Sequence, residues 1–423
     1  MSTRTLFAVL LAAAVALIST PGIAGAAAAA VPPEDFYSAP ALTATGRPGD
    51  ILRQQPMQLA LSASIGPDTF PASATRIMYR TTEAAGAAAA ATGVVLDPAA
   101  PWRGPGARPL VSVAVGTHGL APQCQPSRLL DKVVDFRPPR GVFTEYEVAA
   151  ISALLAQGIA VVVSDYLPDS YLIAPAEAHA VIDAARAAQR LGAAGIPDRG
   201  PVGFWGYSQG GHAAGAVAEQ VGSYAPELDV RGTYAGSAPV DIIETFDYAD
   251  GSLLTGAIGY FLTSLRATFP DTRSVVDSAL NAAGQRMMQE TSNRCILETA
   301  LDYGFHKSAE WTTDGRSIPD TLAAHPATAG AVAAQRLGST TPSAPVYLVT
   351  GDADEVVPDG IRRLARDWCA SGATVKLVDI PLPKILPGYA VGHVLDAAIG
   401  AFGGGFEWLQ ERFVGVQAPN TCT

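Results

Sequence analysis

Residues 202–215 read VGFWGYSQGGHAAG and place Ser208 between Gly206 and Gly210. The apolar residues before Ser208 predict a strand, and the Ala-rich residues after it predict a helix. In so tight a strand-to-helix turn, side chains two residues before and after the serine would collide, so glycine is needed at both positions. The turn pushes the serine out at the end of the strand, which predicts a reactive nucleophile. The competing interpretations are an ordinary helix cap and a flexible turn.

The residues around this stretch alternate between β-branched and Ala-rich runs. From about residue 109 onward, PLVSVAVG, IAVVVSDY and PVGFWGYS are predicted strands, and EYEVAAISALLAQG and APAEAHAVIDAARAAQRLG are predicted helices. Apolar strands that alternate with helices are typical of a parallel sheet covered on both faces. Before residue 109, AATGVVLDPAAPWRGPG predicts antiparallel edge strands with a Pro/Gly turn.

The strand pattern is interrupted once, for about a hundred residues. It pauses at about residue 241 and resumes with APVYLVTGDADEVVP at about residue 344, and the residues between are helical in pattern. Such an insertion between two core strands is expected to form a cap over the strand ends. The predicted division is therefore a first core segment at 31–240, a helical cap or lid at 241–340 and a second core segment at 341–423.

The N-terminus has the pattern of a secretory signal peptide. Arg4 precedes an apolar run from Leu6 to Ile18, and small residues follow. This run is shorter than the roughly 20 residues that cross a membrane. Residues 1–30 are expected to be removed, with an uncleaved anchor helix as the alternative. The mature protein is expected to be secreted, either free or associated with the cell wall.

Composition narrows the classes of partner. The chain has 28 Lys and Arg against 39 Asp and Glu, for a net charge of −11. An acidic exported protein is a poor candidate for binding nucleic acid or anionic membranes. Its cysteines are Cys124, Cys295, Cys369 and Cys422. An even number in an exported chain favours disulfides over metal ligation, and their spacing leaves all three pairings open.

A reactive serine needs a histidine base oriented by an acid, and in this architecture the acid and then the histidine follow it along the chain. The loop TGDADEVVP offers Asp352, Asp354 and Glu355. Asp354 is predicted because it stands past the strand end, whereas Asp352 is better placed to brace the turn. Only His393, in GYAVGHVLDAAIG, follows this acid. His212 is excluded because it lies on the helix that follows the tight turn at Ser208, here called the elbow. The alternative is that the three acids are solvated loop residues and that the histidine is structural or solvated.

Attack by such a serine puts negative charge on an oxygen of the tetrahedral intermediate, which needs two backbone donors. The N–H of Gln209 is the first, and the loop VGTHGLAPQC supplies the second, for which Thr117 is predicted and His118 is the close alternative. Asp165, which ends an earlier strand, is interpreted as a turn or helix-capping residue. No metal-ligand spacing or Gly-rich nucleotide motif occurs, so no metal or cofactor is expected.

These motifs together resemble the secretory lipases of actinobacteria and yeasts, the Candida lipase A-like family of the α/β hydrolases. The resemblance rests on GTHGLAPQCQPSRLL, GFWGYSQGG, TGDADEVVP and GYAVGH, and spans roughly residues 35–422. It implies an α/β-hydrolase fold, with a mostly parallel sheet, helices on both faces and an inserted helical cap. It also implies a lipase or carboxylic ester hydrolase with Ser208, Asp354 and His393 as its triad.

The resemblance further implies a disulfide pairing, Cys124 with Cys295 and Cys369 with Cys422. The first bond would tie the oxyanion loop to the cap, and the second would tie down the C-terminal tail.

The expected function is a secreted serine ester hydrolase that acts on acylglycerols or other esters, as a triacylglycerol lipase that forms an acyl-enzyme. The cap would contact the lipid–water interface, and neither nucleic acid nor an obligate protein partner is expected. One alternative is an acyltransferase with the same triad. Another is a non-catalytic binding scaffold, against which the complete set of Ser, Asp and His argues.

Overall fold

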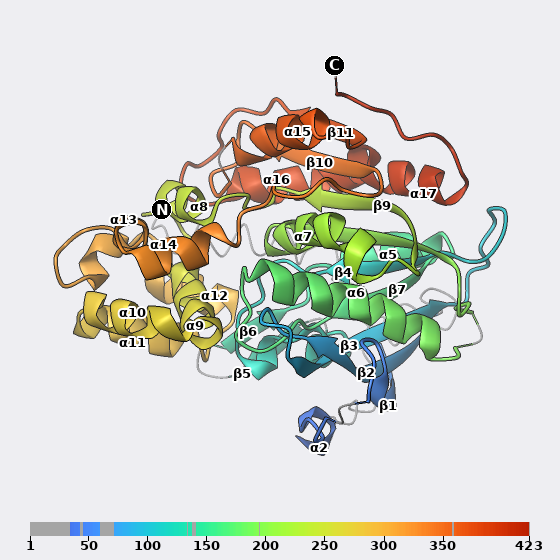
Figure 1. The fold of residues 1–423 in the computed structure, drawn as a ribbon, viewed down its shortest axis with the longest axis horizontal. Helices are drawn as coiled ribbons and strands as arrows, with labels where there is room; N and C mark the ends of the chain where they lie inside the picture. The colour runs from blue at the N-terminus through green and yellow to red at the C-terminus, as the bar shows by residue number, and fades with distance from the viewer. Residues whose placement is uncertain are drawn as a thin grey trace, which may run out of the picture.

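A nine-stranded sheet forms the centre of the protein, in the order β1-β2-β3-β7-β4-β8-β9-β10-β11 (Figure 1). The computed structural model describes residues 34–42, 45–59, 72–132, 134–137, 141–193, 195–357 and 359–422, so the predicted signal peptide at 1–30 lies outside the described residues. The parallel strands are β4 (Leu110–Ala114), β7 (Ala160–Ser164), β8 (Pro201–Tyr207), β9 (Asp229–Gly236), β10 (Val346–Gly351) and β11 (Val375–Ile380). The antiparallel edge strands are β1 (Ile51–Met57), β2 (Ala72–Thr82) and β3 (Ala88–Pro98).

Helices cover both faces of this sheet, and alternate residues of β8 contact different helices. A Cβ on Gly203 would lie 2.8 Å from Phe413 of α17 (Phe406–Phe413), and the Trp205 ring stacks on Phe406 of the same helix. A Cβ on Gly206 would instead meet Gly210 of α7 (Gln209–Tyr224). Since successive side chains of a strand point to opposite faces, α17 and α7 lie on opposite sides of the sheet. The mixed, mostly parallel sheet with helical layers confirms the predicted fold class.

The two core segments contain further helices. They are α2 (Glu34–Tyr37), α4 (Pro126–Leu129), α5 (Val148–Ala156), α6 (Ala174–Arg190), α15 (Gly360–Ala370) and α16 (Val391–Gly400). The longest of them, α6, packs beside α7. A separate two-stranded sheet pairs β5 (Val134–Arg137) with β6 (Gly141–Thr144).

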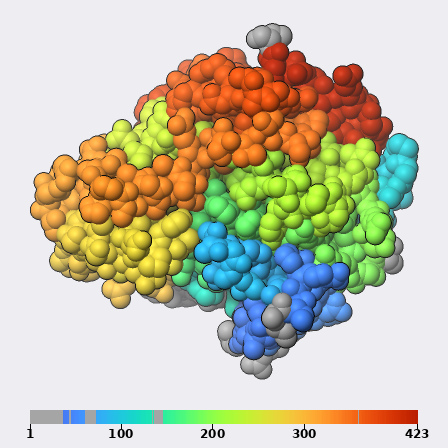
Figure 2. Space-filling model, viewed as in Figure 1, coloured from blue at the N-terminus to red at the C-terminus, as the bar shows by residue number. Residues whose placement is uncertain are grey.

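Between β9 and β10 the chain forms a run of helices that contribute most of a second apolar cluster. They are α8 (Ile242–Ala249), α9 (Ile258–Thr268), α10 (Arg273–Ala279), α11 (Ala282–Thr291), α12 (Ile296–Tyr303), α13 (Ile318–Ala324) and α14 (Pro326–Ala333). Figure 1 shows them gathered at one end of the sheet, and Figure 2 shows most of this segment as a yellow and orange lobe beside the core. Tyr260, Phe261 and Leu265 are buried in this lobe. Among the described helices, none has the length and apolar character to cross a membrane.

Candidate active site

Ser208 stands in the turn between β8 and α7, with backbone angles of φ 60° and ψ −122°. This is a conformation that non-glycine residues seldom adopt, and such strain clusters at functional sites. A Cβ on Gly206 would lie 1.9 Å from the Gly210 carbonyl oxygen, and a Cβ on Gly210 would lie 1.9 Å from the Ala114 carbonyl oxygen of β4. Both glycines are thus required, but the prediction had the wrong neighbour for Gly210. It is the adjacent strand, and not the residue at position 206, that excludes a side chain there.

This contact gives a stability prediction. Gly210→Ala is expected to lower the free energy of unfolding by about 3 kcal/mol or more, because backbone atoms must move to admit the methyl group. The matched control is Gly330→Ala on α14, where an added Cβ meets nothing within 4 Å. There the change should raise stability by about 0.5–1 kcal/mol, since alanine favours a helix over glycine. Urea unfolding of the three proteins measures both effects, and equal stabilities would contradict the tight elbow.

The structure brings Ser208, His393 and Asp354 into one hydrogen-bonded chain. Ser208 Oγ lies 2.9 Å from His393 Nε2, and His393 Nδ1 lies 2.9 Å from Asp354 Oδ2 and 3.1 Å from Oδ1. Asp354 follows β10 and His393 lies in the first turn of α16. The backbone N–H groups of Val356 and Val357 donate to Asp354 Oδ1 at 2.8 and 2.9 Å. A carboxylate held in this way fixes the orientation and tautomer of the imidazole.

The surroundings of Asp354 keep it ionised although it is buried. Burial by itself raises the pKa of this carboxyl, but His393 and the two backbone donors outweigh it and hold the pKa below its ordinary value of 3.8. The rejected candidate, Asp352, is largely exposed, and its Oδ1 pairs with Arg362 at 2.6 Å. Glu355 is buried, and burial raises its pKa. Of the three acids, the described contacts link only Asp354 to His393.

The carbonyl groups of the loop after β4 are held by hydrogen bonds, whereas the N–H groups of Thr117 and His118 are open. Each carbonyl oxygen from residue 115 to residue 118 accepts a hydrogen bond, and the donors are in order Tyr166 Oη, His118 Nδ1, Tyr146 Oη and the backbone N–H of Ile296. Within the described residues, no partner is seen for the N–H of Thr117, His118 or Gln209. The first N–H groups of a helix are normally unpaired, which accounts for Gln209. Of the three residues, Thr117 lines the same cavity as Ser208.

Buried ionisable side chains lie in this loop and against it. His118 Nε2 lies 3.4 Å from Glu145 Oε1, and the His118 ring stacks on Tyr146 with centroids 4.5 Å apart. Burial lowers the pKa of His118, but Glu145 and the Gly116 carbonyl raise it by more, to about 9. This shift favours the protonated form of His118, which the neighbouring Glu145 stabilises. The N–H of Gly116 also donates to Glu147 Oε1 at 2.8 Å, and burial raises the pKa of this carboxyl to about 7.

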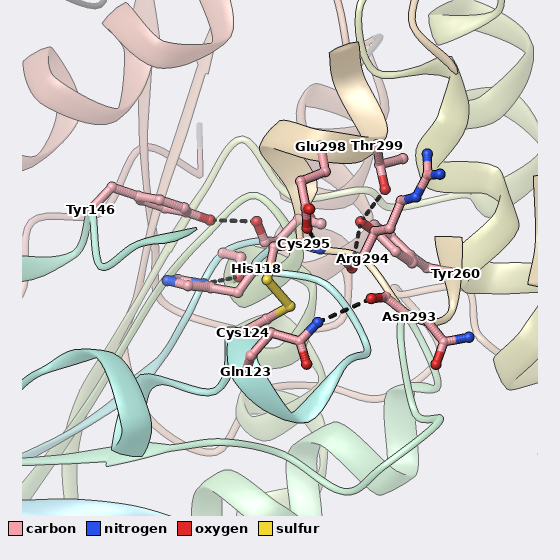
Figure 3. The surroundings of a disulfide bond; sticks show 12 residues. His118, Gln123, Cys124, Tyr146, Tyr260, Asn293, Arg294, Cys295, Glu298 and Thr299 are labelled. Atoms are coloured by element: carbon pink, nitrogen blue, oxygen red, sulfur yellow. Dashed lines mark hydrogen bonds between the residues drawn. A yellow bond between two sulfur atoms is a disulfide. The ribbon is translucent and has the colours of Figure 1, made fainter. Parts of the chain in front are cut away.

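A disulfide joins the same loop to the helical lobe. Cys124 is bonded to Cys295, the residue before α12, and Figure 3 shows the loop and the lobe meeting at this bond. Next to it, Gly119 forms a β-bridge with Cys295, and Gln123 Nε2 donates to the Asn293 carbonyl at 3.0 Å. The loop and the start of α12 are thus one covalently linked unit. The second bond joins Cys369 of α15 to Cys422 near the C-terminus, so both pairs are those that the resemblance implies.

A buried network behind the elbow was missed from the sequence. Glu177 Oε1 accepts a hydrogen bond from Gln209 Nε2 at 2.7 Å, and Glu177 Oε2 lies 3.0 Å from His212 Nδ1. His212 Nε2 lies 3.0 Å from the Gln335 carbonyl oxygen, where the chain returns from the lobe. This network fixes the side chain that follows Ser208. The only signal for it in the sequence is that Glu177 is an acidic residue in the Ala-rich run APAEAHAVIDAA.

Asp165 lies in a different network from Ser208. Its carboxylate accepts hydrogen bonds from Thr92 Oγ1 at 2.6 Å and from the backbone N–H of Ser127 at 2.9 Å. Ser127 is the second residue of α4. The helix-capping interpretation therefore describes its contacts, although the capped helix precedes it in the chain.

Asp396 is a second acid close to the histidine. Its carboxyl group is buried against Gly351, and neither oxygen has a hydrogen-bond partner within the described residues. Burial raises its pKa from the ordinary value of 3.8 to about 7, as does the charge of Asp354, while His393 and Arg362 oppose the shift. Because the folded pKa is the higher one, the fold favours the neutral acid. This contribution to stability is complete below pH 3.8 and is lost as the pH rises to about 7.

Asp396→Asn should remove this pH-dependent loss. The Tm of the variant relative to the unchanged protein is expected to rise between pH 4 and pH 8, by several degrees. Asp367→Asn, at an exposed position of α15, is the control and should show no such rise. Thermal unfolding at the two pH values tests this, and a Tm difference that does not change with pH would contradict the assignment of Asp396.

Ser208 and His393 open into an apolar cavity of about 410 Å³ that core and helical lobe line together. Phe246, Leu254 and Ile296 contribute from the lobe, and Trp205 and Ala397 from the core. A cavity of this size with a few polar groups at one point is typical of a small-molecule site.

Comparisons with known proteins agree on one family. Residues 136–421 match the secretory lipase family. The chain is 29% identical over 390 residues to a Mycobacterium tuberculosis protein described as a probable inactive lipase, covering 91% of this chain and 83% of that protein. It is 26% identical over 407 residues to a secreted triacylglycerol lipase of Malassezia globosa, covering 92% and 81%.

Among solved structures, Candida antarctica lipase A superposes with a TM-score of 0.75 at 23% identity, covering 89% of this chain and 85% of that one. This similarity supports the α/β-hydrolase fold that the sheet order indicates. With the family match extending over residues 136–421, the chain belongs to the secretory lipase family.

Proposed function

We propose that the protein is a secreted serine ester hydrolase, and specifically a triacylglycerol lipase. The observation that carries this proposal is the hydrogen-bonded chain from Asp354 through His393 to Ser208, which ends in an apolar cavity. A hydroxyl with a base and an orienting acid is the arrangement that makes serine a nucleophile. Residues of the helical lobe, 241–340, line this cavity, which supports the role of the lobe as a cap.

In the proposed mechanism, His393 Nε2 takes the Ser208 proton as Oγ attacks the ester carbonyl carbon. The backbone N–H groups of Gln209 and Thr117 stabilise the negative oxygen. His393 then donates the proton to the leaving alcohol, and an acyl-enzyme remains on Ser208. Water, deprotonated by the same histidine, releases the acid and restores the serine.

The lining of the cavity supports the proposed substrate class, and the disulfides and the N-terminal pattern support secretion. The apolar lining of the cavity favours a long-chain ester, in agreement with the secreted triacylglycerol lipase of Malassezia globosa among its relatives. The two disulfides and the N-terminal signal pattern support secretion. A similar protein is described as a probable inactive lipase, so activity itself must be measured.

The experiment is hydrolysis of p-nitrophenyl esters from acetate to palmitate, and of a triacylglycerol emulsion, by the mature protein. We expect turnover of long-chain esters and release of fatty acid from the emulsion. No turnover of any ester by folded protein would overturn the proposal. Transfer of the acyl group to an added alcohol, with little hydrolysis, would show instead an acyltransferase with the same residues.

A further inference from the structure

His118 makes a side-chain contact that the proposed mechanism does not use. Its Nδ1 lies 2.9 Å from the Gly116 carbonyl oxygen. A carbonyl oxygen can only accept, so Nδ1 carries a hydrogen and donates it, whether the ring is neutral or charged. The Gly116 carbonyl belongs to the same peptide unit as the N–H of Thr117. In a planar trans peptide the two groups point in opposite directions, so a bond that holds the oxygen also fixes the direction of the Thr117 N–H.

The His118 ring is itself held on its far edge and on one face. Glu145 Oε1 lies 3.4 Å from Nε2, and both side chains are buried. The same Glu145 oxygen accepts a hydrogen bond from the backbone N–H of Glu147 at 3.1 Å, which keeps it in place. The Tyr146 ring stacks on the His118 ring at an interplanar angle of 14°, as Figure 3 shows. The donor at Nδ1 is therefore fixed in position and not free to rotate.

The two neighbouring peptide units of the loop are held from the same short segment. The N–H of Gly116 donates to Glu147 Oε1 at 2.8 Å, and Tyr146 Oη donates to the Thr117 carbonyl at 3.0 Å. Residues 145–147 thus hold the loop on both sides of the peptide that carries the Thr117 N–H.

Gly116 is the point at which this loop meets the elbow. A Cβ on Gly116 would lie 2.6 Å from Tyr146 Oη and 3.3 Å from the carbonyl oxygen of Tyr207, the residue before Ser208. The absence of a side chain therefore lets the loop lie directly against the elbow, and the peptide that follows Gly116 is next to the nucleophile.

We propose that His118, held by Glu145, is a positioning residue for the second oxyanion donor, the N–H of Thr117. The inference rests on the proposed function and deepens it. Gln209 begins α7, whose backbone orients its N–H, whereas Thr117 lies in a loop without regular secondary structure and depends on side chains. Linked hydrogen bonds also strengthen one another, so a donor on the Gly116 carbonyl makes the Thr117 N–H a stronger donor to the negative oxygen.

The test measures the affinity for a ligand that forms the negative oxygen without being hydrolysed. With a long-chain alkyl trifluoromethyl ketone, Ser208 Oγ bonds to the carbonyl carbon, the π electron pair moves to the oxygen and the serine proton goes to His393. The corresponding trifluoromethyl alcohol has no carbonyl and measures binding without an oxyanion. Calorimetric titration gives both dissociation constants, and neither depends on the fraction of protein that is folded.

His118→Phe removes Nδ1 and keeps a ring against Tyr146. It is expected to weaken ketone binding at least about tenfold and to lower kcat by a similar factor with KM little changed, since complete loss of an oxyanion donor costs about 10²–10³-fold. Binding of the alcohol should not change. His118→Asn, whose amide can donate to the same carbonyl, should restore the ketone affinity to within about threefold of the unchanged protein.

The matched control is His179→Phe. His179 Nδ1 lies 3.2 Å from the Thr82 carbonyl oxygen, and its ring stacks on Tyr224 with centroids 4.0 Å apart. It thus makes the same two kinds of contact on α6, and it does not line the cavity that contains Ser208. Its ketone affinity should equal that of the unchanged protein.

A double variant covers the case in which His118→Phe alone does not fold. The single change leaves Glu145 buried without its partner, which is costly. Combining His118→Phe with Glu145→Gln removes this charge, and the same loss of ketone affinity is expected.

Tyr146→Phe decides which N–H is the donor. Tyr146 Oη holds the Thr117 carbonyl, whose peptide unit carries the N–H of His118. A larger loss of ketone affinity in Tyr146→Phe than in His118→Phe would assign the donor to the His118 N–H and overturn the inference.

The remaining outcomes separate this inference from the proposed function. If esters are hydrolysed and His118→Phe binds the ketone as tightly as the unchanged protein, the positioning role fails alone. If no ester is hydrolysed but the ketone binds with the expected pattern, the proposed function fails and the positioning role stands. If the unchanged protein neither hydrolyses esters nor binds the ketone, both are overturned.

Discussion

Ser208→Ala is expected to lower kcat for long-chain p-nitrophenyl esters by at least about 10³-fold, because removing the nucleophile of a triad removes covalent catalysis and leaves only binding and the oxyanion donors. The change should leave the fold intact, since it removes only Oγ, which contacts only His393 among the described hydrogen bonds. Steady-state kinetics and thermal unfolding of the purified variant measure the two effects. A variant that keeps more than about a tenth of the activity would mean that another group is the nucleophile.

Asp354→Asn is expected to cause the second large loss of activity. An amide cannot carry the negative charge that holds the His393 tautomer and stabilises the imidazolium, and in serine proteases such a change costs about 10⁴-fold in kcat. A comparable loss in kcat is expected here, with KM changed little. The two backbone N–H donors that hold Oδ1 can still bind the amide oxygen, so the geometry should survive.

The matched control for this variant is Asp352→Asn, two residues away. Its side chain is 66% exposed and pairs with Arg362, away from His393. Exposed ion pairs contribute little, so kcat should stay within about twofold of the unchanged enzyme. A larger loss in Asp352→Asn than in Asp354→Asn would reverse the choice between the two acids.

The parts of the fold that the sequence predicted are those with a strong local signal. The continuous apolar run of β7, AVVVS, is buried on both faces as a central parallel strand requires. The elbow was predicted because Ser208 stands between Gly206 and Gly210 where a predicted strand meets a predicted helix. The site residues Asp354 and His393 were chosen by chain order and position after a strand, and the structure places both in contact.

What the sequence did not predict depends on long-range packing. Glu177 and His212 are paired although they lie on different helices, and nothing in the run around Glu177 indicates its partner. The neighbour of Gly210 is β4, which is distant in sequence, so only the folded sheet reveals that contact.

The measurement that tests the central claim most directly is covalent labelling by a p-nitrophenyl alkylphosphonate. In this reaction Ser208 Oγ bonds to phosphorus, p-nitrophenolate leaves and His393 takes the serine proton, so no hydrolytic step is needed. Intact mass and peptide mapping should find one phosphonate per chain, on Ser208, and none on the Ser208→Ala variant. An unlabelled folded protein, or equal labelling of the variant, would contradict the account of Ser208 as an activated nucleophile.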